Sequence, residues 1–305
     1  MSNIGFIGLG HMGLHMAHNL VKSTGTRVIG FDVSQPALTA FRQLGGVTAD
    51  SVAEIARTCG VIITMLPKGE HVDAVMNGNS KGEHNGNNSI FANARPGTLL
   101  IDSSTIDIET SVRLAEQARL QGLDFMDAPV SGGEKGAKDG TLSFMVGADP
   151  ETYNKAKPVL EMMGKNLFYV GKNGSGLAVK LVNNMLLGVC MAATGEAFNL
   201  INKLGVDAHI FHTIVSRSSG ANWALEKNCP VPGLVESSPA NNDYRPGFAN
   251  SLMLKDLSLA QQVAMKANAP SPLGSAALSL FSMAEKSGLG NQDMSSILKL
   301  FSGDK

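Results

Sequence analysis

The first 32 residues carry the pattern that most constrains the fold. An apolar run at residues 3–8 leads into a glycine-rich turn, and a helical pattern follows from Met12 to about Lys22. A second apolar run at residues 27–31 then ends in Asp32. A strand, a GxGxxG turn, a helix and a second strand that ends in an acid are typical of a doubly wound α/β domain that binds a dinucleotide.

Each residue of this turn suits the binding of a pyrophosphate. Gly8 permits the tight turn, Gly10 lets the backbone approach the ligand, and Gly13 lets the helix pack on the strand. The N-terminus of the helix offers free N–H groups and a partial positive charge to the phosphates. Asp32 can bind the adenine ribose hydroxyls, and residues 33–35 contain no arginine to compensate a 2′-phosphate, so the pattern favours NAD over NADP. A glycine-rich turn in another α/β fold is the alternative.

The alternation of strands and helices continues to about residue 170. Strand-like runs at residues 61–66, 98–102, 124–126, 143–146 and 166–170 alternate with helical patterns at residues 36–44, 52–57, 109–121 and 151–163. This predicts a parallel, doubly wound sheet, whose ligands lie at the carboxyl ends of the strands. Those ends hold Leu66, Pro67, residues 103–105 and residues 127–133. Residues 77–93, rich in Asn and Gly, are predicted to form a mobile surface loop.

A long apolar stretch at residues 176–204 predicts a helix of about 40 Å. It is apolar nearly all round, which favours burial between two other bodies. Helical patterns follow at residues 207–216, 221–227, 252–266, 272–286 and 293–300. We therefore expect an NAD-binding Rossmann-type domain at residues 1–165 and an all-helical substrate and dimerisation domain at residues 166–305, joined by this long interdomain helix.

Two segments of the second half of the chain carry candidate binding groups. Lys180 and Asn184 are four residues apart, so they share one face of the long helix. Polar groups on an apolar helix are costly unless an anionic substrate and a redox cofactor need them, although a snorkelling lysine is the alternative. Lys255 and Asp256 are neighbours of the kind usually found on a solvated surface.

Residues 127–133 leave a strand and turn on two glycines, Gly132 and Gly133. Backbone N–H groups there could hold a carboxylate, with the hydroxyl group of Ser131 beside them. A plain strand-to-helix turn is the alternative reading of the same residues.

Composition excludes several classes of protein. A net charge of −1 without a basic run gives no electrostatic basis for binding nucleic acid or a membrane surface. The long apolar stretch is a poor membrane span because Lys180 lies within it. Three separated cysteines fit neither a disulfide framework nor a CxxC site, which favours a reducing compartment. No combination of His, Cys and carboxylate residues completes a metal site.

The motifs GFIGLGHMG, FDVS, MLP, IDSST, DAPVSGG, GLAVKLVNNM and LKDLSLA, in this order, resemble the β-hydroxyacid dehydrogenase family nearly end to end. The resemblance implies an NAD-dependent 3-hydroxyacid dehydrogenase in which Lys180 is the catalytic acid/base and Asn184, Ser131, Gly132 and Gly133 bind the substrate carboxylate. The cofactor-binding residues that we expect are Gly8, Leu9, Gly10, His11, Met12, Gly13, Asp32, Leu66, Pro67, His71, Thr105 and Lys255. His71 stands where some members have Asn.

Residues 230–233, 238–242 and 247–248 resemble more narrowly the members that oxidise (S)-3-hydroxyisobutyrate to methylmalonate semialdehyde in valine breakdown. Burial and the positive nicotinamide ring would lower the pKa of Lys180, so that its amine takes the hydroxyl proton while hydride leaves. The alternatives are a family reductase of tartronate, glyoxylate or succinic semialdehyde, and a catalytically silent NAD-binding module. We expect a homodimer or homotetramer, in the cytoplasm of a bacterium or, after removal of a transit peptide, in the mitochondrial matrix of a eukaryote.

Overall fold

The computed structural model describes residues 3–23, 25, 27–78 and 87–302. The chain divides into two compact units, residues 1–180 and residues 181–305. The first unit contains one sheet, formed by β1 (Asn3–Ile7), β2 (Val28–Phe31), β3 (Val47–Thr48), β4 (Cys59–Thr64), β5 (Leu99–Asp102), β6 (Asp124–Asp127), β7 (Val130–Ser131), β8 (Leu142–Gly147) and β9 (Gly164–Gly171). The strand order is β3-β2-β1-β4-β5-β6-β8-β7, with β9 paired to β8.

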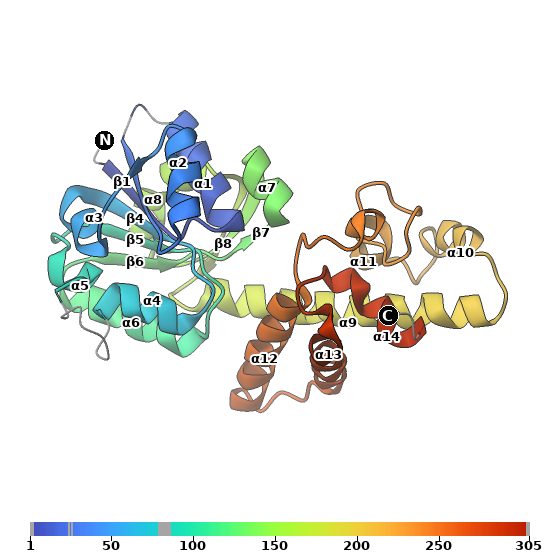
Figure 1. Cartoon of the computed structure of the whole chain (residues 1–305). Coiled ribbons are helices and arrows are strands. Elements are labelled where there is room, and N and C mark those ends of the chain that lie inside the picture. Colours follow the sequence, from blue (N-terminus) through green and yellow to red (C-terminus); the bar gives the residue numbers. More distant parts are fainter. Residues whose placement is uncertain (1–2, 24, 26, 79–86, 303–305) are drawn as a thin grey trace. The chain divides into compact units, whose positions relative to one another are not determined.

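Helices cover both faces of this sheet (Figure 1). They are α1 (His11–Ser23), α2 (Gln35–Gln43), α3 (Val52–Thr58), α4 (Gly69–Asn77), α5 (Ile90–Asn93), α6 (Ile108–Leu120), α7 (Gly133–Asp139) and α8 (Pro150–Leu160). Neighbouring strand residues point to opposite faces, so Phe6 and Ile63 lie in one buried cluster with α1 and α8, whereas Ile7 and Ile62 lie in another with α3 and α6. The predicted doubly wound α/β class is confirmed.

The sheet is mainly parallel, as predicted, with an antiparallel part at one edge. β1 to β6 pair in parallel, and so do β8 and β9, but β8 pairs in antiparallel fashion with both β6 and β7. A parallel pair needs a crossover of about a dozen residues or more. Only the short segment that contains α7 joins β7 to β8, so the chain reverses direction between these two strands.

The predicted loop at residues 77–93 is wrong in its last part. Residues 90–93 form α5, where the Ser89 hydroxyl group accepts a hydrogen bond from the backbone N–H of Ala92 and Ile90 is buried. Residues 79–86 lie outside the described residues. The sequence patterns also missed α4, α7, β3 and β7, because short elements show too little periodicity.

The second unit is helical, as predicted. α9 (Ser175–Lys203) begins in the first unit and continues into the second, followed by α10 (Ala208–Val215), α11 (Trp223–Lys227), α12 (Asn250–Lys266), α13 (Pro272–Ala284), α14 (Leu298–Ser302) and the shorter turns η1 (Pro239–Asn242), η2 (Glu285–Leu289) and η3 (Met294–Ile297). The irregular segment between α11 and α12 is held by buried Asp293, whose carboxylate accepts hydrogen bonds from Asn228, Gly247 and Phe248. The sheet extends to β9, so the predicted domain boundary after residue 165 falls inside its last strand.

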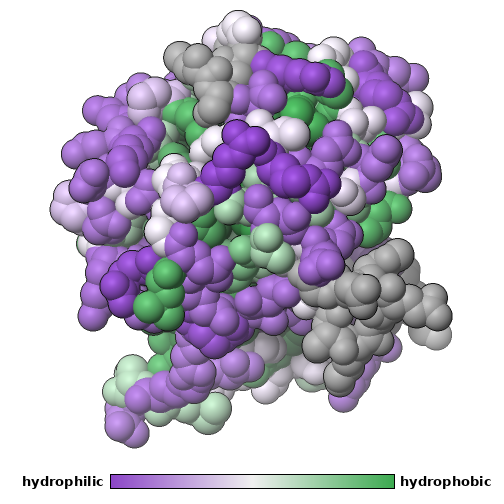
Figure 2. Space-filling model, turned by 90° about the vertical axis from the view of Figure 1, so that its left-hand side faces the viewer, coloured by the Kyte–Doolittle hydropathy of each residue, from purple (hydrophilic) through white to green (hydrophobic). Residues whose placement is uncertain are grey.

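α9 is less buried than its composition predicts. Leu186 and Leu200 are each 61% exposed, while the opposite side of the helix packs closely enough for Gly188 to approach Met253 and Leu257 of α12. Among the described residues α9 is the one helix long and apolar enough to cross a membrane by length and composition alone. The face in Figure 2 is mainly hydrophilic, and the hydrophobic residues on it are scattered. The exposed leucines of α9, which form what is called below its exposed apolar side, need a separate explanation.

Candidate functional site

The glycine-rich turn between β1 and α1 has the backbone geometry that a dinucleotide needs. Gly8 has φ +98°, and a Cβ atom there would collide with the carbonyl oxygen of Met65. A Cβ atom at Gly13 would collide with the carbonyl oxygen of Gly8, whereas one at Gly10 would meet no atom within 4 Å. Packing therefore requires glycine at the first and last positions, and the middle position faces open space in which a pyrophosphate fits.

Asp32 joins the end of β2 to this turn. Its carboxylate accepts hydrogen bonds from the backbone N–H of Leu9 at 2.6 Å and of Ser34 at 2.8 Å. Each carboxylate oxygen has two lone pairs, so both oxygens can still accept from ribose hydroxyls. The adjacent Val33 is 91% exposed and supplies no positive charge for a 2′-phosphate. The turn and Asp32 thus fit NAD.

The segments that follow β4 and β5 are tied together at the same edge of the sheet. The backbone N–H of Leu66 donates to the Ser104 hydroxyl group at 2.8 Å. Buried Asp102 accepts hydrogen bonds from the Thr64 hydroxyl group and from the backbone N–H of Ser104, both through Oδ1. These bonds fix the segments that carry three of the expected cofactor-binding residues, namely Leu66, Pro67 and Thr105. Another expected cofactor-binding residue, His71, is exposed on α4.

Ser131, Gly132 and Gly133 lie where β7 passes into α7. Gly132 and Gly133 are exposed and have φ values of +132° and +62°, which favour glycine. α7 packs against α1: Asn19 donates a hydrogen bond to the carbonyl oxygen of Ala137 at 2.6 Å, and the His15 ring lies 3.5 Å from the Glu134 carboxylate. The expected carboxylate-binding segment is thereby fixed beside α1, the helix that follows the glycine-rich turn.

Lys180 and Asn184 are both buried on the continuous helix α9, with Lys180 only 8% exposed. Within the second unit, Asn184 Nδ2 donates to Asp256 Oδ2 at 2.6 Å, and Asn183 Nδ2 donates to Asn184 Oδ1 at 3.0 Å. Lys255 Nζ lies 3.2 Å from Asp256 Oδ1. The Asp256 carboxylate therefore fixes the orientation of the Asn184 amide.

The interpretation of Lys255 and Asp256 as a solvated surface pair is wrong. Asp256 is buried on the same side of α12 as Met253, Leu257 and Ala260. This apolar spacing was visible in the sequence and would have placed Asp256 on the buried face. What the sequence could not show is that its partner is Asn184.

Two buried acids lie at the carboxyl edge of the sheet, and neither has a role that the sequence patterns specify. Asp102 and Asp127 are the last residues of β5 and β6, where they are paired in register. Burial raises the pKa of each carboxyl group to about 6, although hydrogen bonds from neighbouring donors oppose the shift. Asp127 accepts its bonds from the backbone at the start of α9.

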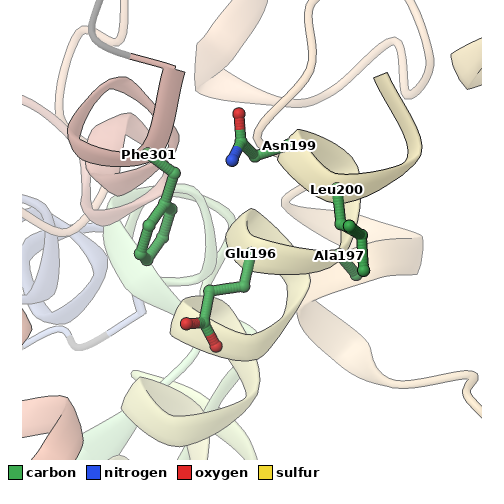
Figure 3. Close-up of a pocket in the computed structure, with 5 residues that line it drawn as sticks. All are labelled: Glu196, Ala197, Asn199, Leu200 and Phe301. Atoms are coloured by element: carbon green, nitrogen blue, oxygen red, sulfur yellow. The ribbon is translucent and has the colours of Figure 1, made fainter. Parts of the chain in front are cut away.

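Two open depressions of the second unit contain none of the expected site residues. One is lined by Glu196, Ala197, Asn199, Leu200 and Phe301 (Figure 3). The other is lined by His209, Ile210, Thr213 and Ile214. They lie on α9, α10 and α14 and contain both polar and apolar side chains.

Known proteins match the chain over nearly its whole length. A family model described as the NAD binding domain of 6-phosphogluconate dehydrogenase matches residues 3–171, and one described as NAD-binding of NADP-dependent 3-hydroxyisobutyrate dehydrogenase matches residues 174–301. The 3-hydroxyisobutyrate dehydrogenase of Pseudomonas aeruginosa is 44% identical over 308 residues, which cover 99% of this chain and 99% of the relative. The NAD-dependent L-serine dehydrogenase of the same organism is 42% identical over 301 residues, which cover 99% and 98%. A solved structure of Mycobacterium tuberculosis 3-hydroxyisobutyrate dehydrogenase with L-serine has a TM-score of 0.89 and 40% identity, and covers 98% of this chain and 99% of that one.

The fold and the site define a dinucleotide-dependent oxidoreductase. Its cofactor is NAD, in agreement with Asp32 and with the NAD-dependent relative. The chain belongs to the β-hydroxyacid dehydrogenase family, as the sequence motifs predicted, and it is an NAD-dependent dehydrogenase of 3-hydroxy acids.

We expect Asp102→Asn to become more stable relative to wild type as the pH rises from acid to neutral. The unfolded carboxyl group titrates near pH 4 and the folded one at about 6, so the folded chain binds more protons between these values. This group therefore lowers the free energy of unfolding as the pH rises through the interval, by on the order of 1–3 kcal/mol. Asparagine cannot ionise, and its oxygen can keep both bonds that Oδ1 accepts.

Urea unfolding of wild type and variant at pH 4.5 and pH 7 measures this effect. The unfolding free energy of the variant minus that of wild type should be larger at pH 7 than at pH 4.5. An equal difference at both values would contradict the assignment.

Proposed function

We propose that the chain oxidises 3-hydroxyisobutyrate to methylmalonate semialdehyde with NAD. The observation that carries the proposal is the burial of Lys180 and Asn184 on one face of apolar α9. An amine and an amide in such a place suit a hydroxy-carboxylate, because one can move the hydroxyl proton while the other binds the carboxylate. The relative of P. aeruginosa that bears the name of this activity supports the choice of substrate.

In the proposed mechanism, NAD would supply, when bound, the acceptor for the hydride that leaves the carbinol carbon. The amine of Lys180 removes the proton of the substrate hydroxyl group, and its burial disfavours the ammonium form that could not do so. The backbone N–H groups of Gly132 and Gly133, the Ser131 hydroxyl group and the Asn184 amide bind the carboxylate. In the reverse direction the protonated amine returns the proton to the aldehyde oxygen.

Binding of the cofactor falls to the residues of the first unit and to Lys255. The N–H groups at the start of α1, from His11 to Gly13, would bind the pyrophosphate, and Asp32 would accept from the adenine ribose. Leu66, Pro67, His71 and Thr105 would contact the nicotinamide half. The open space at Gly10 and the two oxygens of Asp32 support these roles.

L-Serine is a second candidate substrate, favoured by the names of one relative and one solved structure. It too is a 3-hydroxy acid, and it differs from 3-hydroxyisobutyrate by an ammonium group in place of the C2 methyl group. The carboxylate and hydroxyl groups that the proposed residues engage are common to both compounds. The choice therefore depends on the surroundings of C2, where the two differ in charge. A semialdehyde reductase of the same family and a silent NAD-binding module have no such observation in their favour.

Lys180→Ala should lower kcat by about 10²–10⁴-fold, the usual contribution of a general base, while the Kd for NADH stays within threefold of wild type. NADH production at 340 nm gives kcat, and NADH fluorescence gives the Kd. Lys203→Ala is the matched control, because Lys203 is an exposed lysine in the last turn of the same helix. Turnover by Lys180→Ala near the wild-type rate would remove Lys180 as the base.

A substrate panel separates the two candidate activities. We expect kcat/KM to be highest for (S)-3-hydroxyisobutyrate among that compound, 3-hydroxypropionate, glycerate and L-serine, and higher with NAD than with NADP. A methyl group in an apolar pocket is worth about 1–3 kcal/mol, so 3-hydroxypropionate should lose roughly 10–200-fold. An equal or higher value for L-serine would overturn the proposed substrate, and no activity with any compound would favour the silent module.

We propose further that the enzyme is a homo-oligomer formed through the exposed apolar side of α9 and through α10. Leu200, Ile210 and Ile214 are each more than half exposed, and the two depressions of the second unit lie beside them. Large exposed apolar side chains on these helices support an interface, because their burial on association is favourable. All three cysteines are free thiols, and two are buried, which supports a reducing compartment: the bacterial cytoplasm or the mitochondrial matrix.

The double variant Leu186→Asp, Leu200→Asp should be monomeric where wild type is a dimer or tetramer, because two carboxylates at an apolar interface are costly to bury. Light scattering after size-exclusion chromatography gives the mass of each. Leu120→Asp is the control, since Leu120 is 72% exposed on α6 in the other unit. A monomeric wild type, or a double variant of unchanged mass, would refute this interface.

A further inference from the structure

We propose that Asp127 is a positioning residue of the dehydrogenase: its carboxylate fixes the first turn of α9 to the end of β6 and so sets the place of the Lys180 amine. The inference rests on the proposed role of Lys180 as the base. The residues involved belong to the first unit, so the geometry is complete within one compact body.

Both oxygens of Asp127 are used by the backbone at the start of α9. Oδ1 accepts a hydrogen bond from the N–H of Gly174 at 2.6 Å, and Oδ2 accepts one from the N–H of Leu177 at 2.9 Å. The first N–H groups of a helix lack partners within the helix, and here a strand-end carboxylate supplies them. Lys180 is three residues after Leu177, on the next turn of the same helix.

The neighbouring backbone is shaped around this carboxylate. A Cβ atom at Gly147 of β8 would lie 2.5 Å from Asp127 Oδ1, and one at Gly176 would collide with the carbonyl oxygen of Met145 and lie 2.9 Å from Asp127 Oδ2. Asn173 Nδ2 donates to the carbonyl oxygens of Phe125 and Gly147 at 2.9 and 3.3 Å. The start of α9 is therefore packed on β6 and β8 with no space for even a methyl group at these glycines.

Both the charge and the two acceptor oxygens matter at this position. The positive end of α9 and its N–H groups offset the cost of burying a carboxylate. An asparagine would keep one acceptor, but its NH₂ group would face a backbone N–H that needs an acceptor. The first turn would then move away from β6, and the amine of Lys180 would move with it.

Such a movement affects catalysis more than binding. A misplacement of about 1 Å at a catalytic group can cost on the order of 10²-fold in rate. The residues proposed to bind the pyrophosphate and the adenine ribose lie in the turn between β1 and α1, in the first turn of α1 and directly after β2. Asp127 makes no hydrogen bond to them within the described residues. Loss of the Asp127 contacts should therefore lower kcat and leave the affinity for NADH unchanged.

Asp127→Asn tests the inference, with Asp149→Asn as the matched control. Asp149 caps α8 in the same unit through bonds from the N–H groups of Glu151 and Thr152, and α8 carries none of the proposed site residues. We expect kcat of Asp127→Asn to fall about 10–100-fold, with the Kd for NADH within threefold of wild type. Asp149→Asn should keep the wild-type kcat even if its melting temperature falls as much as that of Asp127→Asn.

Labelling of the Lys180 amine gives a readout that needs no substrate. Reaction with pyridoxal 5′-phosphate and borohydride, quantified on the Lys180 peptide by mass spectrometry, should change severalfold in Asp127→Asn and stay unchanged in Asp149→Asn. An inactive wild type would refute the proposed function, and the labelling would still decide the role of Asp127. An active wild type with unchanged kcat and labelling in Asp127→Asn would overturn the inference alone.

Asn173→Ala keeps the test decisive if Asp127→Asn does not fold. This change removes the side-chain bonds that brace the same turn and leaves the buried carboxylate in place. We expect kcat to fall roughly 3–10-fold with the NADH affinity unchanged. A folded Asn173→Ala whose Lys180 labelling changes while its kcat stays at the wild-type value would overturn the inference, because the place of the amine would then not control the rate.

Discussion

One buried carboxylate holds the start of the long helix α9 on the sheet. Asp127 ends β6 and holds the backbone N–H groups of Gly174 and Leu177, so the helix that carries Lys180 begins from a fixed point on the sheet. A free helix end is the most mobile part of a helix, and here the positive end of α9 meets a negative charge in a place from which water is largely excluded. The proposed proton transfer by Lys180 would therefore depend on a contact to the sheet and not to a loop.

A carboxylate at the end of a strand accepts a hydrogen bond from a backbone N–H of a neighbouring segment at three places along the carboxyl edge of the sheet. Asp32 follows β2 and holds the N–H of Leu9 in the glycine turn, and Asp102 ends β5 and holds the N–H of Ser104. Asp127 does the same for α9. In each case a strand-end acid uses its side chain to fix a neighbouring segment that carries expected site residues, which suits a fold whose ligands bind at this edge.

The sequence could predict what depends on local pattern. The fingerprint, the alternation of apolar strands and helices, and the length of α9 come from neighbouring residues, and they predicted the class of fold, the cofactor and the helical second half. The pairing of Asn184 with Asp256 and of Asp127 with the start of α9 joins residues far apart in sequence, and no periodicity records such a contact. The antiparallel edge at β7 and β8 was missed because two-residue strands show no alternation, and the exposed side of α9 because apolar composition does not show which face is covered.

A crystal structure of the enzyme with NAD and its hydroxy acid tests the role of Asp127 and Lys180 most directly. In that structure Lys180 Nζ should lie within about 2.6–3.2 Å of the substrate hydroxyl oxygen, while the N–H groups of Gly174 and Leu177 remain on the Asp127 carboxylate. An amine that points away from the hydroxyl group, with the first turn of α9 still held by Asp127, would contradict it.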